Sequence, residues 1–406
     1  MSEVWKENFS QCSKNSRPSP IREMLAVISQ PGMISFAGGM PAPEVFPVNE
    51  FWKCLEDLKK EGKNVLQYGI TEGDPRLREF LLKWTTPRLG KTAEMNQILL
   101  TTGSQQALDL FGWAMLDVGD YIIAEDPTYL AAINAFNNHG GKFIGVPMDA
   151  EGMEVDKLPG IIEKARSEGK ILKFIYTIVN FQNPGGATLS VERRKKLAEV
   201  AAKYRIPILE DDPYGYVRYD GEHLPSIYSF DKEGLVLYAG SFSKILSPGV
   251  RIGWLIGNAT IIRQMAIFKQ ATDLCSSPLT QAATAEYCNR GLLDAHLPSI
   301  ISNYRVKRDA MEVSFKKHLV SRGVKWVKPE GGFFYWVDFG GIDAMELGKK
   351  SMEKKILFVP GSPFCIDPSI GKNKARVNYT FSSPEVIEQG VMRLAEAIDE
   401  MRIPAK

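Results

Sequence analysis

The sequence contains little of what metal sites, disulfide frameworks and histidine-based catalytic sites require. Its 406 residues include only five cysteines and four histidines. The cysteines lie far apart and form no CxxC pair, which argues against a zinc site or a disulfide framework and favours a reducing, cytoplasmic compartment. The histidines are equally isolated, so a metal hydrolase or a Ser-His-Asp triad has little to build on. Catalysis must therefore use Lys, Tyr, Asp or Arg side chains, or a bound cofactor.

Strong charge and long apolar runs are also missing. The chain has 50 basic and 48 acidic residues, a formal net charge of +2, and its Lys and Arg residues are scattered. This distribution is not that of a nucleic-acid-binding protein. No run of about 18 apolar residues is present to cross a bilayer, and the start, MSEVWKENFSQC, has acids and no apolar signal core. We expect no nucleic-acid partner and no membrane partner.

The apolar pattern between residues 52 and 290 predicts an α/β fold. Helical periodicity over Ser104–Met115 and Val191–Tyr204 alternates with short runs that are often apolar throughout, as expected of parallel strands covered on both faces. The predicted strands are Tyr121–Ala124, Lys142–Val146, Ile171–Val179, Ile206–Leu209, Leu235–Ala239 and Ile252–Ile256.

The last third of the chain has a different texture. A long helical region, Leu279–Arg322, is followed by strand-like segments and a closing helix, which predicts a smaller α+β domain that includes the N-terminal arm. A short helix is expected in that arm around Ser19–Ser29. The predicted limits are residues 1–50 for the arm, 51–290 for the large domain and 291–406 for the small domain. The strand-like segments are Lys325–Phe339, Ile356–Val359 and Arg376–Phe381, and the closing helix is Pro384–Met401.

The most informative segment, LYAGSFSK, ends at Lys244, and Arg251 follows seven positions later in PGVRIGW. Lysine is ordinarily a solvated surface group, but this one follows an apolar strand in a turn rich in Ser, Gly and Pro. An amine beside a cation in a partly dry pocket has a lowered pKa, which suits Schiff-base chemistry. The nearby serines and Arg251 would hold a phosphate dianion.

At this spacing, SFSK and PGVRIGW resemble the signature of the class I/II aminotransferases, which have the aspartate-aminotransferase fold. The resemblance runs from about residue 20 to the C-terminus. It implies pyridoxal 5'-phosphate (PLP) as cofactor, with Lys244 as the catalytic residue that holds it as a Schiff base. It also implies fold type I, in which a mainly parallel seven-stranded sheet is flanked by helices, and a smaller α+β domain is formed by the N-terminal arm and the C-terminal part.

The resemblance also assigns residues to the cofactor's phosphate. Ser104 and Gln105 stand in TTGSQQ, between a strand and a helix, where backbone N–H groups bind phosphate; alone, this turn would be only a helix cap. Ser241 and Arg251 complete the phosphate site. Tyr68, in LQYGITEGDPR, matches a tyrosine that reaches the phosphate of the neighbouring subunit, which implies a homodimer with shared active sites.

Further matches concern the cofactor ring. Tyr129, in EDPTY, stacks on the pyridine, and Asn183, in NFQNPGG, binds the phenolate oxygen. By themselves these residues would be a core tyrosine and part of a common Asn-Pro-Gly turn. The chain departs from the family at Gly185, where a threonine is usual.

The acidic segment EDDPY contributes two more ring contacts. The resemblance makes Asp211 the carboxylate that faces the pyridine nitrogen and Tyr214 a second partner of the phenolate. An ionised Asp keeps that nitrogen protonated, which makes the ring an electron sink. Asp212 is an alternative for the same role, and a solvated acidic loop is the plainer interpretation of the segment.

Three residues are assigned to the substrate in addition to Asn183. Arg376, in KARVNY, matches the bidentate clamp for the α-carboxylate; its alternative is a rim salt bridge. The segments SPIREML and ISFAGGMPAPEVFP resemble the subgroup of 2-aminoadipate, kynurenine and aromatic aminotransferases, which places Gly39 at the substrate. We hypothesise that Arg22 contacts the distal carboxylate of glutamate or 2-aminoadipate, the alternative being a surface residue of a docking helix.

The resemblance predicts a transaminase that moves the amino group of an L-amino acid to 2-oxoglutarate by a ping-pong mechanism through Lys244. The donor is 2-aminoadipate, an aromatic amino acid, kynurenine or a leucine-like amino acid. Alternatives are an alanine–glyoxylate aminotransferase and a PLP-dependent lyase or decarboxylase. A transcription regulator carrying this domain needs about 60–100 more N-terminal residues with a basic recognition helix. Only a short arm precedes Ile34, so a regulator is not expected.

Overall fold

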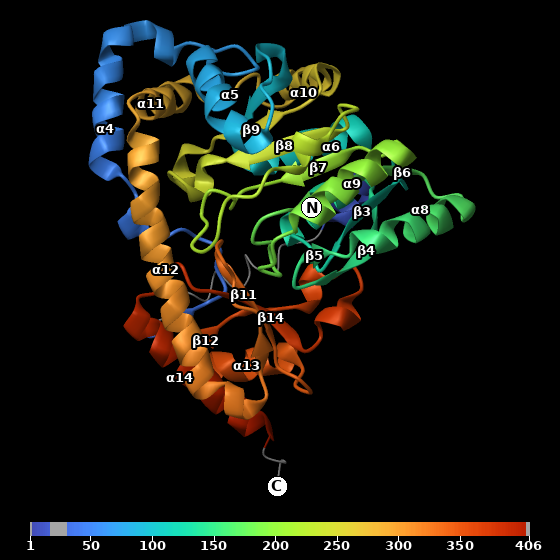
Figure 1. The fold of residues 1–406 in the computed structure, drawn as a ribbon, viewed down its shortest axis with the longest axis vertical. Coiled ribbons are helices and arrows are strands. Elements are labelled where there is room, and N and C mark those ends of the chain that lie inside the picture. Colours follow the sequence, from blue (N-terminus) through green and yellow to red (C-terminus); the bar gives the residue numbers. More distant parts are fainter. Residues whose placement is uncertain (1, 17–30, 403–406) are drawn as a thin grey trace.

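The computed structural model describes residues 2–16 and 31–402. An eight-stranded sheet forms the centre of the larger part of the molecule (Figure 1). From edge to edge its strands are β2 (Ile98–Thr101), β9 (Gly253–Ile256), β8 (Val236–Ser241), β7 (Ile208–Asp211), β6 (Leu172–Ile178), β3 (Tyr121–Asp126), β4 (Lys142–Asp149) and β5 (Gly152–Met153).

The five strands in the middle of this sheet, β4, β3, β6, β7 and β8, run parallel. Strand β9 is antiparallel to β8, and β2 is antiparallel to β9. Every residue of β7 and β8 is buried, as expected for strands covered on both faces. The predicted α/β class with a mainly parallel sheet is confirmed, and the two-residue strand β5, antiparallel to β4, is added to the seven strands expected.

All six strands predicted for this sheet are present, with boundaries that differ by at most three residues. At their carboxyl ends, β3, β7 and β8 continue past the predicted limits into Asp126, Asp211 and Ser241, and β4 continues furthest, to Asp149. Backbone pairing does not depend on the polarity of the side chain. A pattern of apolar residues therefore ends before the strand does.

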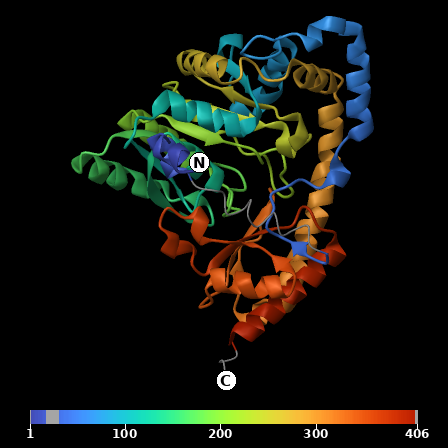
Figure 2. The same ribbon diagram turned by 180° about the vertical axis from the view of Figure 1, so that it is seen from behind.

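Helices lie on both faces of the large sheet. Helices α8 and α9 lie on the side turned toward the viewer in Figure 1, and α6 lies on the side seen in Figure 2. Helix α9 has the predicted limits, and Ser190 caps it by accepting a hydrogen bond from Arg193 N. The helices of this part are α4 (Val48–Asp57), α5 (Pro75–Leu89), α6 (Gly103–Met115), α7 (Leu130–Asn138), α8 (Leu158–Ser167), α9 (Val191–Tyr204), α10 (Ala259–Thr272) and α11 (Pro278–Asn289).

The smaller part of the molecule contains an antiparallel four-stranded sheet and three helices. The N-terminal segment joins it, because β1 (Ile34–Ser35) pairs in parallel with β12 (Ile356–Leu357). This confirms a small α+β domain built from both ends of the chain. Its sheet is β10 (Lys325–Trp326), β11 (Phe334–Asp338), β14 (Lys374–Asn378) and β13 (Val359–Pro360), and its helices are α12 (Leu292–His318), α13 (Ala344–Glu353) and α14 (Pro384–Arg402).

The long helical region expected at Leu279–Arg322 is two helices, α11 and α12. Gly291, with φ +72°, separates them because this left-handed conformation ends a helix. Helix α12 then runs from the larger part to the smaller one (Figure 1). The predicted domain limit at residue 290 coincides with this break and stays a prediction.

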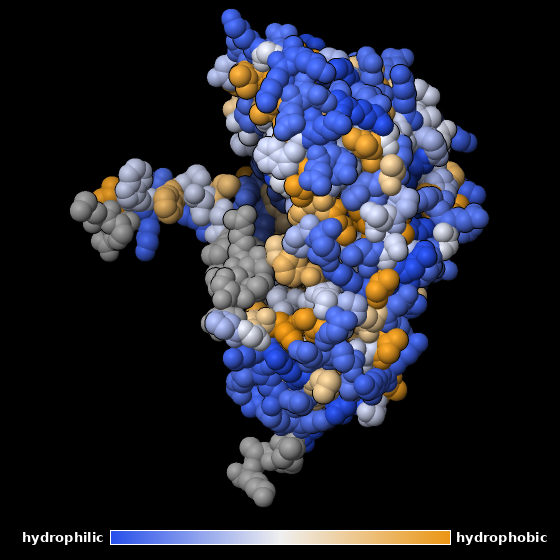
Figure 3. Space-filling model, turned by 90° about the vertical axis from the view of Figure 1, so that its left-hand side faces the viewer, coloured by the Kyte–Doolittle hydropathy of each residue, from blue (hydrophilic) through white to orange (hydrophobic). Residues whose placement is uncertain are grey.

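The first described residues form two short helices, α1 (Ser2–Glu7) and α2 (Gln11–Asn15). Helix α2 contacts the body at α7, where Cys12 Sγ donates to Asn138 O, and α1 projects beyond it (Figure 3). Val4, Trp5 and Phe9 are exposed on this arm. The predicted helix at Ser19–Ser29 lies outside the described residues. None of the described helices is long and apolar enough to cross a membrane.

The start of α6 lies so close to Gly253 in β9 that a side chain there would collide with it. A Cβ at Gly253 would lie 2.7 Å from Ser104 N and 2.8 Å from Gly103 C, both backbone atoms that have little room to move. We expect Gly253→Ala to lower the free energy of unfolding by about 1–3 kcal/mol, measured by urea denaturation. Gly160→Ala is the matched control, because its Cβ meets nothing within 4 Å inside α8. It should stabilise by about 0.5–1 kcal/mol; equal effects of the two variants would contradict the close approach.

Candidate active site

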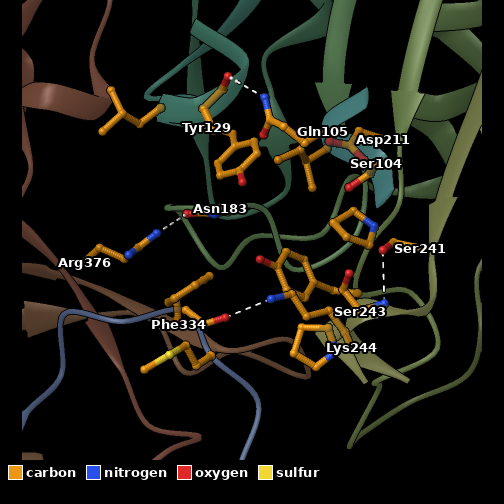
Figure 4. Close-up of a pocket in the computed structure, with 18 of the residues that line it drawn as sticks. Ser104, Gln105, Tyr129, Asn183, Asp211, Ser241, Ser243, Lys244, Phe334 and Arg376 are labelled. Atoms are coloured by element: carbon orange, nitrogen blue, oxygen red, sulfur yellow. Dashed lines mark hydrogen bonds between the residues drawn. The ribbon is translucent and has the colours of Figure 1, made fainter. Parts of the chain in front are cut away.

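A cavity of about 440 Å³ opens at the carboxyl ends of the parallel strands, where they face β11 and β14 (Figure 4). The carboxyl ends of parallel strands meet at one edge of a sheet, which is the usual ligand site of such folds. Eleven of the thirteen residues singled out from the sequence line this cavity: Gly39, Ser104, Gln105, Tyr129, Asn183, Asp211, Tyr214, Ser241, Lys244, Arg251 and Arg376.

Lys244 reaches the cavity from the short 3₁₀-helix Phe242–Lys244, which directly follows β8. Its Nζ donates a hydrogen bond to Gly39 O at 2.8 Å and lies 5.1 Å from the ring centre of Phe333. Burial and, to a smaller extent, the positive charges of Arg376 and Arg251 together lower the pKa of Lys244 to about 8. A sizeable fraction of the amine is therefore neutral, and so nucleophilic, near neutral pH.

Arg376 enters the cavity from β14 and is only 2% exposed. Its Nη1 donates to Asn183 Oδ1 at 3.1 Å and its Nη2 to Ala37 O at 2.8 Å, while the guanidinium lies 4.3 Å from the ring centre of Phe334. Burial lowers the pKa of Arg376 to about 10, so the group stays charged at neutral pH. Its Nε has no partner among the described residues, and no described carboxylate pairs with it. This site fits the carboxylate of a ligand.

Asp211 ends β7 and is 2% exposed. Its Oδ2 accepts a hydrogen bond from the Tyr176 hydroxyl at 2.8 Å, whereas its Oδ1 is buried without a partner in the described part of the chain. Burial raises the pKa of Asp211 to about 7. A buried acceptor without a donor is costly, so this oxygen fits a ring N–H such as that of a protonated pyridine.

Asp212, the alternative acid, faces another environment. Its Oδ2 accepts from Arg88 Nη1 and from the Tyr238 hydroxyl, both at 3.1 Å, and its Oδ1 accepts from Asn180 Nδ2 at 2.7 Å. Consecutive side chains at a strand end point in opposite directions. Asp212 is therefore part of a buried ion pair, and Asp211 is the acid at the cavity.

The start of helix α6 forms one end of the cavity. The first N–H groups of a helix lack partners within it, and here they belong to Gly103, Ser104 and Gln105. A Cβ at Gly103 would lie 2.3 Å from Arg251 Nη2, so the guanidinium packs directly on the helix start. Ser241 is also at this end, where its Oγ accepts a hydrogen bond from Ser243 N. Helix N–H groups, hydroxyls and a guanidinium fit a phosphate group.

A buried lysine that the sequence analysis missed supports this end of the cavity. Lys269 Nζ donates to Gln106 Oε1 at 2.8 Å and to Asp273 Oδ1 at 2.8 Å. Gln106 Oε1 also accepts from Thr102 N, the residue that precedes α6. The only signal in the sequence is the i,i+4 spacing of Lys269 and Asp273, which is common on exposed helix faces and does not indicate burial.

Some of the remaining predicted residues line the cavity and others do not. Tyr129 and Tyr214 present their rings to the cavity, and burial raises the pKa of both, which keeps their hydroxyls protonated. Tyr68 does not line the cavity of its own chain and is 77% exposed. Arg22 lies outside the described residues. Tyr176 and Phe334 were missed, because the pairing of β6 with β7 and of β11 with β14 brings them to Asp211 and Arg376.

Comparison with known proteins identifies the family of this chain. The family model described as aminotransferase class I and II matches residues 35–394. Aromatic-amino-acid aminotransferase 1 of Thermococcus litoralis is 42% identical, over 98% of this chain and 95% of its own length, and the 2-aminoadipate transaminase of Thermus thermophilus is 35% identical, over 97% of each. The solved Pyrococcus horikoshii kynurenine aminotransferase, in complex with PMP, superposes with a TM-score of 0.94 at 41% identity and 98% coverage of each chain. The chain therefore belongs to the class I and II aminotransferases and is a PLP-dependent transaminase.

Proposed function

We propose that the enzyme moves the amino group of an L-amino acid to 2-oxoglutarate by a ping-pong mechanism that depends on Lys244 and Arg376. The observation that carries this proposal is that Lys244 and Arg376 line the same cavity and that neither is paired with a described carboxylate. Arg376 binds the α-carboxylate of the amino acid in one half-reaction and of the oxo acid in the other. Lys244 is then the group that moves protons at the α-carbon.

The cavity residues divide the binding of PLP among them. When bound, PLP supplies a protonated ring that accommodates the electrons left at the α-carbon after its proton departs. Asp211 would accept a hydrogen bond from the ring nitrogen through its free Oδ1, and Tyr129 would cover one face of the ring. Asn183 and Tyr214 would donate to the ring oxygen. Ser104, Gln105, Ser241 and Arg251 would hold the phosphate.

Lys244 has two tasks. Its neutral amine would hold the cofactor through the aldehyde carbon. Once the amino acid has taken its place, the amine would take the proton from the α-carbon as general base and, as general acid, deliver it to the cofactor carbon next to the transferred nitrogen. A pKa of about 8 suits both tasks, because the amine binds and releases a proton close to neutral pH. Arg376 contributes to this pKa by its positive charge as well as by binding the substrate.

We propose aromatic amino acids, 2-aminoadipate, kynurenine and leucine-like amino acids as donors. The names of the relatives support the first three classes. Gly39 borders the substrate region, since its carbonyl oxygen contacts Lys244 and a Cβ there would lie 3.1 Å from Phe334 Cζ. Contact of Arg22 with a distal carboxylate stays a prediction.

We further propose a cytoplasmic homodimer with shared active sites. The exposed Tyr68 supports it, since a tyrosine side chain that is 77% exposed is free to reach the phosphate site of a second subunit. The projecting arm with Trp5 offers a second apolar contact for that subunit (Figure 3). All five cysteines are free thiols, which supports a reducing compartment.

The test of this function is a panel of donors against 2-oxoglutarate, pyruvate and glyoxylate, run with the wild type and with Lys244→Ala. We expect the wild type to form a new amino acid from 2-oxoglutarate, and Lys244→Ala to lose both turnover and the visible absorbance of lysine-bound cofactor. Products formed without an oxo acid would instead identify a lyase or decarboxylase. Best turnover of alanine with glyoxylate would replace the proposed donors.

Arg376→Gln should weaken the binding of every carboxylate substrate while the cofactor absorbance is kept. Loss of charged hydrogen bonds of about 3 kcal/mol corresponds to a rise in KM of roughly 100-fold. Steady-state kinetics with the amino acid and with the oxo acid measure it. A decarboxylated amine as donor is the control, because it has no carboxylate to lose; equal losses for amine and amino acid would contradict the assignment.

The lowered pKa of Lys244 predicts how cofactor incorporation depends on pH. Only the neutral amine attacks the aldehyde, so the rate at which PLP is incorporated into cofactor-free enzyme should rise with pH and reach half its maximum near pH 8. Stopped-flow absorbance measures this rate. Arg376→Gln removes a like charge and should move the midpoint to higher pH. A wild-type midpoint near 10.5, the ordinary value for lysine, would contradict the prediction.

A further inference from the structure

The turn at residues 182–187 carries Asn183 into the active site. It follows β6 and is closed by two backbone hydrogen bonds, from Gly186 N to Gln182 O at 2.6 Å and from Gln182 N to Ala187 O at 2.8 Å. Asn183 Oδ1 accepts from Arg376 at the cavity (Figure 4). The position of this one amide therefore affects both the cofactor site and the carboxylate site.

The side chain of Gln182 ties the turn to the end of β3. It is 1% exposed, and each of its polar atoms has a partner. Its Nε2 donates to Glu125 Oε2 at 3.1 Å and to Pro127 O at 2.8 Å, and its Oε1 accepts from Gly185 N at 2.6 Å. One buried amide thus connects the strand, the turn and the backbone two residues beyond Asn183.

Glu125 anchors the side chain of Gln182. Its carboxylate, buried in β3, also accepts hydrogen bonds from Ile178 N at 3.2 Å and from the Thr177 hydroxyl. Both donors belong to β6, the strand next to β3 in the sheet. A buried polar network in which every member is satisfied holds a single arrangement of its parts.

The side chain of Gln182 fills the space beside Gly185. A Cβ at Gly185 would lie 2.8 Å from Gln182 Oε1 and 3.4 Å from Met148 Cε. The first distance is too short for a carbon–oxygen contact, so the amide oxygen occupies the room that any side chain at residue 185 would need. The departure from the family's threonine at this position has a structural reason in this chain.

We propose that Gln182 is a positioning residue for Asn183, acting with Glu125 as its anchor and Gly185 as the residue that leaves it room. This inference rests on the proposed function, because the role of Asn183 toward the cofactor is part of that proposal. Gln182 touches neither substrate nor cofactor. It holds Asn183 so that the amide nitrogen faces the ring oxygen and the amide oxygen faces Arg376.

The test compares Gln182→Leu with Asn183→Ala in the PLP-loaded enzyme and measures the spectrophotometric pKa of the lysine-bound cofactor. Loss of the donor at the ring oxygen leaves more negative charge beside the bound nitrogen, which favours its protonated form and raises this pKa. We expect Gln182→Leu to raise it by at least half as much as Asn183→Ala, and to raise the KM for amino acids. No change in this pKa for Gln182→Leu, while Asn183→Ala changes it, would overturn the inference.

Gln281→Leu is the matched control for the loss of a buried glutamine. Gln281 is 2% exposed and also binds backbone atoms, accepting from Asp74 N at 2.8 Å and donating to Ser276 O at 2.6 Å, but it has no contact with the turn. We expect it to lower the melting temperature about as much as Gln182→Leu and to leave the spectrophotometric pKa unchanged. An equal rise in pKa for both variants would show a merely structural role and overturn the inference.

A double-mutant cycle tests the match between the two residues and does not depend on Gln182→Leu being stable. Gly185→Ala should raise the spectrophotometric pKa, because the methyl group displaces the amide of Gln182. In Gln182→Ala the same change should have less effect, since the crowded atom is gone. Additive effects would overturn the proposed match. Failure of the proposed function itself is distinguishable, because then the wild type would show no absorbance that depends on Lys244.

Discussion

The active site depends on two cationic side chains that line one cavity, the half-buried Lys244 and the buried Arg376, neither of which pairs with a described carboxylate. Burial of a charge is unfavourable unless hydrogen bonds or counter-charges offset it. Here the carbonyl oxygens of Gly39 and Ala37 and the face of Phe334 offset part of this cost. The remaining imbalance lowers the pKa of Lys244 and leaves Arg376 ready to bind an anion. The site is thus prepared for a substrate with a carboxylate and a cofactor with a phosphate.

These charges meet only because three distant segments of the chain come together. Lys244 follows a strand of the large sheet, Arg376 lies in the small sheet, and the carbonyl groups that accept their hydrogen bonds follow β1 near the N-terminus. Pairing of β1 with β12 fixes that third segment against the small domain. The large domain alone would therefore form its part of the cavity without Arg376.

Of the polar residues at the ends of buried strands, some face the cavity and others hold neighbouring side chains in place. Asp211 presents an oxygen without a described partner to the cavity. The carboxylate of its neighbour Asp212 instead accepts hydrogen bonds from Arg88, Tyr238 and Asn180. Lys269 supports the start of α6 through Gln106, whose Oε1 accepts hydrogen bonds from both Lys269 Nζ and Thr102 N. Asp211 and the start of α6 are thus held by Tyr176 and Lys269, two groups that do not line the cavity.

The sequence by itself determined the fold class and the strands that lead to the site, because apolar periodicity is a property of neighbouring residues. Eleven of the residues that line the cavity were assigned through the family resemblance that short local motifs carry. It did not distinguish Asp211 from Asp212 without the resemblance, and it did not reveal Tyr176, Phe334 or Lys269. Those assignments depend on strand register, domain contact and burial, which join residues far apart in the chain. Only the tertiary structure decided them, since hydrogen-bond partners and pKa values are set by what surrounds a group in space.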